Sequence, residues 1–175
     1  MKMIGFIIKV LTFPGAYLHG YWEHIMCKTY DCPVDDNRYF RKGEMCGHVD
    51  HEFFPTAARQ FLFCFFPMLF NLFLGFAIGI PAVIRIFFVG GEQWYHYVLL
   101  WLGISFLTNL FPLIDDAMAM WEGVYNSDKN IFVKIIAAPL YAIIYAGAYL
   151  NTWGLTVITS ALALYYFPLM GILFV

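Results

Sequence analysis

Long apolar stretches dominate the pattern of hydrophobic and polar positions in this 175-residue chain. An uninterrupted apolar run of about 18 residues or more is typical of a transmembrane helix. The pattern therefore predicts an all-α polytopic membrane protein with about five transmembrane helices. The apolar stretches cover residues 3–27, 57–89, 94–113, 131–150 and 153–175.

The stretch 57–89 is too long for one upright helix and too short for two helices with a loop. Gly75, Gly79 and Pro81 lie inside it, and such residues accompany kinks. We therefore expect this helix to be kinked or broken. Only a very short polar turn separates the last two stretches, which predicts a C-terminal helical hairpin over residues 131–175.

The longest polar region, residues 28–56, separates the first two apolar stretches. Within it, apolar and polar residues alternate around Tyr39-Phe40, Gly47-His48-Val49 and Phe53-Phe54. Such alternation favours strands, so this loop is expected to hold a short β-hairpin.

Composition supports membrane embedding and one domain over residues 1–175. Apolar residues make up 62% of the chain and charged residues 13%, which is too few to cover a soluble domain of this size. The lipid bilayer is thus the expected partner. A net charge of −2 without a basic stripe argues against nucleic acid.

Lysine and arginine positions predict the orientation, because cytoplasmic loops are enriched in them. With five crossings, most basic residues fall on the side of the loop 28–56 and of the C-terminus, and we expect that side to be cytoplasmic. A re-entrant pair within 57–89 would reverse this assignment. The basic residues on that side are Lys28, Arg38, Arg41, Lys42, Arg59, Lys129 and Lys134.

Ionisable residues next to apolar stretches are candidates for a metal site. His19 and Glu23 are four residues apart, so they share a helical face and could grip one metal ion. His24 points about 100° away from Glu23. Asp115 or Asp116 could add a carboxylate. The alternatives are a solvated cluster at the membrane surface and a helix N-cap at the aspartates.

A second group of metal-binding residue types gathers around the polar loop. Three thiols and an imidazole could form a structural zinc site there, although the spacing matches no standard zinc motif. A Cys27–Cys32 or Cys32–Cys46 disulfide and unlinked thiols are the alternatives. The residues of this group are Cys27, Cys32, Cys46, His48 and His51.

Several short segments, in order and spacing, resemble the site-2-protease-like membrane metalloproteases, and in particular a branch of small members. The resemblance covers residues 10–121 and implies a protease-like core there. It aligns Asp116 with the family's metal-binding aspartate. The segments are Phe13 to His19, Tyr39 to Arg41, Gly47 to Glu52, Phe66 to Asn71 and Phe111 to Ala117.

The HExxH motif of that family is altered in this chain. His19 occupies the first histidine position, but Gly20 replaces the glutamate that serves as general base, and Glu23 replaces the second histidine. The resemblance therefore implies a divalent metal, with zinc expected, held by His19, Glu23 and Asp116. Secondary candidates are His24, His51 and Asp115.

We accordingly expect a degenerate, metal-binding relative of the protease fold that is not a standard peptidase. A non-catalytic structural or accessory subunit of a membrane protein complex is one alternative. The other is an active intramembrane metalloprotease with unusual ligands and a membrane-embedded substrate. If the chain is an enzyme, it is a metal-dependent membrane hydrolase whose catalytic glutamate position is Gly20.

Overall fold

The structure, a computed structural model, is mainly helical and describes residues 3–36, 39, 47–52, 54, 56–126 and 131–173. Cys46 and Lys129 lie outside these residues. The helices are α1 (Met3–Leu11), α2 (Phe13–Thr29), α3 (Ala57–Val83), the π-helix η1 (Ile84–Val89), α4 (Trp94–Thr108), α5 (Ile114–Tyr125), α6 (Ile131–Thr152) and α7 (Thr156–Leu173). Two strands, β1 (Val34–Asp36) and β2 (Asp50–His51), complete the described elements.

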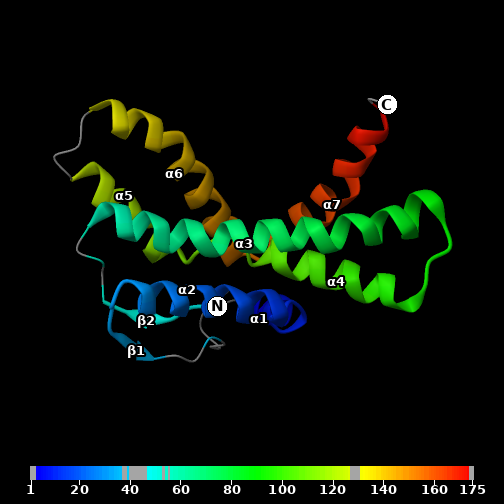
Figure 1. Cartoon of the computed structure of the whole chain (residues 1–175), viewed down its shortest axis with the longest axis horizontal. Coiled ribbons are helices and arrows are strands. Elements are labelled where there is room, and N and C mark those ends of the chain that lie inside the picture. The colour runs from blue at the N-terminus through cyan, green and yellow to red at the C-terminus, as the bar shows by residue number, and fades with distance from the viewer. Residues whose placement is uncertain are drawn as a thin grey trace.

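Helix α3 is the central element and contacts α2, α4, α5 and α7 (Figure 1). Helix α4 runs back along the second half of α3, whereas α2 and α5 lie beside its first half (Figure 1). The other two long helices, α6 and α7, diverge from the middle of α3 (Figure 1). The first half of α3 is thus enclosed on several sides, and this half carries the site described below.

The stretch 57–89 forms a single helical rod of α3 and η1 and is not broken. Its glycines let neighbouring helices pack closely against it. A Cβ atom at Gly75 would lie 2.6 Å from the Leu107 side chain, and one at Gly79 would lie 2.6 Å from Leu164. The helical irregularity instead follows Pro81, where η1 begins. Glycine here lets α4 and α7 approach α3.

Within the described residues, two helices are long and apolar enough to cross a membrane, so the expectation of about five spanning helices is wrong in number. They are Ala58–Val89, which joins α3 to η1, and Ile131–Thr152, which is α6. A helix rises about 1.5 Å per residue, so a core of about 30 Å needs about 20 residues. Helix α4 has only 15 residues, and the apolar run Thr156–Gly171 in α7 is also shorter.

The first apolar stretch is divided at Thr12, between the 9 residues of α1 and the 17 of α2. Thr12 donates its hydroxyl to the Ile8 carbonyl, and its own carbonyl accepts hydrogen bonds from Ser105 and Asn109. Pro14, in the first turn of α2, suits the start of a new helix. These contacts with α4 explain why one continuous helix does not form.

A short antiparallel β-ladder lies in the polar loop, as expected, but on other residues. β1 pairs with β2, with Val34 opposite His51 and Asp36 opposite Asp50. Gly47, His48 and Val49 precede β2 without being part of a strand. Phe40 and Phe53 lie outside the described residues. The pairing matters because it places His51 beside the segment that follows α2.

The two C-terminal helices meet at the expected short turn but then separate. Gly154 in this turn has a φ of +72°. Thr156 donates its hydroxyl to the Asn151 side chain at 3.0 Å, and both residues are buried. Beyond this junction, α6 and α7 diverge (Figure 1).

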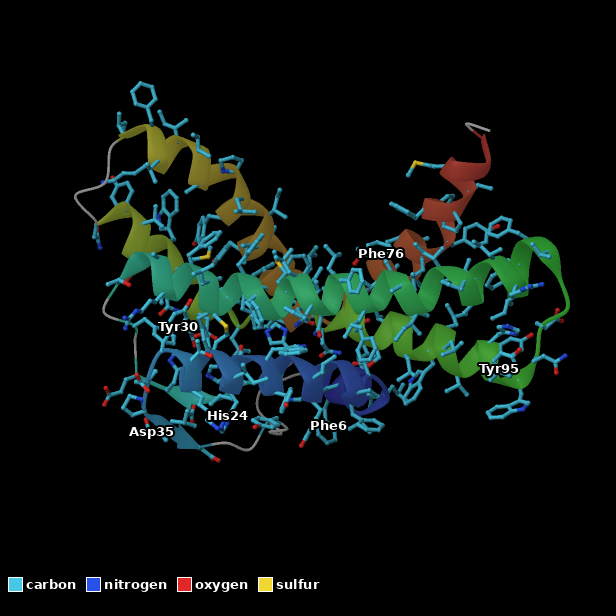
Figure 2. All side chains as sticks on the ribbon, viewed as in Figure 1. Phe6, His24, Tyr30, Asp35, Phe76 and Tyr95 are labelled. Carbon is cyan, nitrogen blue, oxygen red and sulfur yellow. The ribbon has the colours of Figure 1, made fainter. Side chains whose placement is uncertain are left out.

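Large apolar side chains on these diverging helices are exposed. Ile136 of α6 is 75% exposed, and many side chains of both helices point away from the rest of the protein (Figure 2). Phe76 of α3 lies beside α7, with its ring 5.2 Å from Phe167 (Figure 2). An apolar surface of this extent marks a membrane or protein interface.

Candidate metal centre

His19 and Glu23 lie on one face of α2, as their spacing predicts. His19 Nε2 and Glu23 Oε1 are 3.3 Å apart, and both side chains are buried. Neither atom has a hydrogen-bond partner among the described residues. A buried imidazole lone pair and a buried carboxylate oxygen thus face the same small volume. This arrangement is costly without a cation or proton between them.

The ring of His19 is oriented by α4. Its Nδ1 lies 2.9 Å from the Asn109 carbonyl oxygen, which can only accept a hydrogen bond. Nδ1 therefore carries a proton, and Nε2 is the nitrogen that faces Glu23 and could bind a metal. Asn71 donates to the same carbonyl at 2.7 Å. Sequence reasoning noted Asn71 and Asn109 only as parts of motifs and missed this orienting role.

Close packing between α2 and α4 makes that hydrogen bond reachable. A Cβ atom at Gly15 would lie 2.0 Å from the Ser105 carbonyl oxygen, so only glycine fits here. The backbone N–H of Gly15 donates to the Ser105 hydroxyl at 2.8 Å. The Pro-Gly step that opens α2 therefore sets both the start of the helix and its distance from α4.

Asp116 reaches the same site from the first turn of α5. It is 5% exposed, whereas its neighbour Asp115 is exposed and takes no part. The N-cap of α5 is Leu113, so neither aspartate is the cap. Both nonetheless lie where negative charge interacts favourably with the helix dipole.

His48 joins this site, whereas the spacing had assigned it to the cysteine group. Its Nδ1 lies 3.3 Å from Glu23 Oε2 and 3.3 Å from Asp116 Oδ2. The ligand atoms of these three residues all lie within 4.8 Å of one another. No sequence periodicity links a loop residue to α2 and α5, so its position could not be predicted.

Glu23 is held in its ionised form. Burial by itself would raise the pKa of Glu23, but the neighbouring imidazoles of His19 and His48 outweigh it and hold the pKa at about 2. The Val49 backbone N–H also donates to Glu23 Oε2 at 3.0 Å. An ionised carboxylate is the form that binds a metal.

His24 does not belong to the site. It lies on the side of α2 away from α3 (Figure 2), and its ring centroid is 5.8 Å from that of Tyr39. His51 lies at the edge of the site, with Nε2 3.8 Å from Asp116 Oδ1. Of the secondary candidates, only His51 is thus close to the first three residues.

Cys27, Cys32 and His51 form a second cluster one helical turn beyond Glu23. Their ligand atoms also lie within 4.8 Å of one another. Both cysteines are free thiols, so the Cys27–Cys32 disulfide is absent. Burial and the nearby Cys32 raise the pKa of Cys27 to about 12. Cys46 lies outside the described residues, so its part in this group stays a prediction.

Gly20, which the resemblance aligns with a catalytic glutamate, is covered by the polar loop. A Cβ atom at Gly20 would lie 3.0 Å from Tyr39 Cβ and 3.3 Å from the backbone nitrogen of His48. A Cβ at Gly47 would lie 1.7 Å from the Ala16 carbonyl oxygen. The two glycines thus allow the loop to lie directly on α2, and a Cβ atom at position 20 would fit only if the loop shifted by a few tenths of an ångström.

No protein-family model, curated protein or solved structure matches this chain. The resemblance to the site-2-protease-like metalloproteases therefore stays a prediction from the quoted motifs.

Proposed function

We propose that this chain is a membrane-embedded metal-binding protein with a remodelled site-2-protease-like core, and that it is not a standard peptidase. The carrying observation is the buried convergence of His19, Glu23, His48 and Asp116 from α2, the polar loop and α5. We call these four residues the histidine–carboxylate site. The paragraphs below take the membrane, the metal and the chemistry in turn.

Membrane embedding is supported by α3 with η1 and by α6, which have the length and apolar character of spanning helices. The apolar side chains exposed on α6 and α7 are what lipid or a membrane partner would cover. Tyr95 and Trp94, at the tip between α3 and α4, are residue types that favour the membrane–water interface.

The donor set suits a divalent cation such as Zn²⁺. Two buried carboxylates within a few ångströms repel each other, and a doubly charged ion would neutralise both. Imidazole and carboxylate donors also accept Mn²⁺ and Fe²⁺, but Zn²⁺ is the usual choice for mixed histidine and carboxylate ligands. The unpartnered Nε2 of His19 and Oε1 of Glu23 fit this assignment.

The local geometry argues against peptide hydrolysis. Four protein ligands would leave no open position, and catalytic zinc sites keep one. Gly20 supplies no general base, and the polar loop packs closely over Ala16 and Gly20. We infer a structural or accessory role in a membrane protein complex, with the exposed faces of α6 and α7 as the partner-binding surface.

The experiment is metal analysis of the full chain purified in detergent. We expect stoichiometric metal in the wild type and its loss in the His19→Ala and Asp116→Asn variants. Asp115→Asn is the matched control, because Asp115 is the exposed neighbour of Asp116 and should leave the metal content unchanged.

Two outcomes would overturn the proposal. One is wild-type protein without zinc, iron or manganese and with the same thermal stability as His19→Ala. The other is metal-dependent cleavage of a membrane-embedded peptide by the purified chain, which would establish the active-protease alternative, with His48 available beside the two carboxylates as a base.

A further inference from the structure

Backbone hydrogen bonds hold the second cluster in place. The chain reverses after α2 at Asp31, whose φ is +52°, and the Cys32 N–H donates to the Cys27 carbonyl at 2.9 Å. Cys32 is thereby brought back beside the last turns of α2. His51 arrives from β2, because its partner Val34 follows Cys32 by two residues. Two independent backbone contacts thus converge on three metal-binding side chains.

The His51 ring is held in place by contacts on several sides. Its Nδ1 lies 2.6 Å from the Glu52 carbonyl oxygen, which also accepts a hydrogen bond from Cys32 Sγ at 3.2 Å, so the ring and the thiol meet at one backbone oxygen. The ring packs 4.2 Å from Phe63 and 5.3 Å from Phe54, measured between centroids. A carbonyl and two aromatic rings thus hold the His51 ring beside Cys32.

We propose that Cys27, Cys32 and His51 form a second metal site, the thiol site, that takes a soft divalent cation such as Zn²⁺. Two thiolates and one imidazole are a common zinc donor set, and thiolates select softer metals than carboxylates do. Cys27 is fully buried, whereas Cys32 is partly exposed, so an ion can reach the site from the loop side.

The thiol site adjoins the histidine–carboxylate site without sharing its four residues. Cys27 follows Glu23 by one helical turn. The two sites approach each other at Asp116, where His51 Nε2 lies 3.8 Å from Oδ1 and His48 Nδ1 lies 3.3 Å from Oδ2. Because the ligand sets differ, either site can be wrong while the other is right.

Cobalt distinguishes the two sites, since a thiolate ligand gives Co²⁺ an intense sulfur-to-metal charge-transfer band in the near ultraviolet. The metal-free full chain would be titrated with Co²⁺ in detergent with a reductant. We expect this band in the wild type and its loss in the Cys27→Ser/Cys32→Ser double variant. Cys64→Ala is the matched control, because Cys64 is a buried thiol outside the cluster and its removal should leave the band.

His19→Ala separates this proposal from the proposed function. It should lose metal at the histidine–carboxylate site and keep the charge-transfer band. His51→Ala should weaken Co²⁺ at the thiol site by more than about tenfold, at least the loss seen for outer-shell partners. A wild type that binds Co²⁺ without the band, or a double variant that keeps it, overturns the thiol site.

A second measurement uses only the wild type, so it tests the site even if the variants do not fold. In the wild type, Zn²⁺ should slow alkylation of Cys27 and Cys32, located by peptide mass analysis, and a chelator should restore the rate. Equal alkylation with and without Zn²⁺, or a Cys27–Cys32 disulfide in the reduced preparation, would also refute the site.

Discussion

Two regions around α3 differ in what they bury. Around its first half, α2, the polar loop and α5 enclose histidines, carboxylates and thiols. At its middle, α6 and α7 diverge and expose large apolar side chains (Figure 1). Buried polar groups are retained where they bind something, and exposed apolar groups where something covers them. The comparison separates two regions. We call the surroundings of the first half of α3 the ligand-binding half, after the metal sites proposed above, and we call the exposed faces of α6 and α7 the apolar half.

The largest expected difference between the two regions is in how closely their helices pack. Gly15→Ala should destabilise the protein by about 3 kcal/mol or more, the upper end of overpacking, because the new Cβ would lie 2.0 Å from the Ser105 backbone oxygen. Gly171→Ala in α7, with open space around it, should be neutral or stabilising by up to about 1 kcal/mol. Denaturant unfolding in detergent measures both. Equal destabilisation would show that α7 is packed as tightly as α2.

The apolar half should be sensitive to charge. Ile143 is 62% exposed near the middle of α6, so Ile143→Lys should raise the cost of membrane insertion by about 3 kcal/mol. Met118→Lys, at a 44% exposed position of α5, should change stability by less than about 0.5 kcal/mol. The fraction of each variant that resists extraction from membranes is the readout. An Ile143→Lys variant that inserts normally would argue that α6 does not span.

Metal removal should destabilise the ligand-binding half. A ligand at about 100 times its dissociation constant stabilises the folded state by about 2.7 kcal/mol, so a chelator should lower the midpoint of thermal unfolding. The effect should be much reduced in Asp116→Asn and unchanged in Asp115→Asn. Thermal scans with and without chelator would show it. If the chelator leaves the unfolding midpoint of the wild type unchanged, the buried cluster does not bind a stabilising metal.

The smallest effect concerns a residue that does not touch the metal. Asn71 donates to the Asn109 carbonyl that holds His19, so Asn71→Ala should weaken metal binding by about 10- to 100-fold. Asn151→Ala is the comparison, since Asn151 is also buried but bonds Thr156 at the α6–α7 junction. It should reduce stability and leave metal affinity unchanged. Competition with a chromophoric chelator measures both affinities, and equal losses would contradict the orienting role.

Spacing along the sequence was enough to predict a contact where both residues lie in the same helix. The four-residue spacing of His19 and Glu23 correctly placed them on one face, because helix geometry alone decides this. A short turn was also expected between the last two helices, but at Asn151-Thr152, which belong to α6; the turn follows them, between α6 and α7. By contrast, the apolar stretches gave too many spanning helices, because helix length depends on breaks such as Thr12, whose partners are in α4.

The amino-acid sequence by itself determined the apolar stretches and the pairing of His19 with Glu23 on one helical face. Tertiary structure alone decided that His48 faces Glu23 and Asp116, and that His51 joins Cys27 and Cys32. The physical reason is that a helix repeats every few residues, so its faces follow from spacing. A loop has no such repeat, and only its packing on α2 through Gly47 positions its histidines.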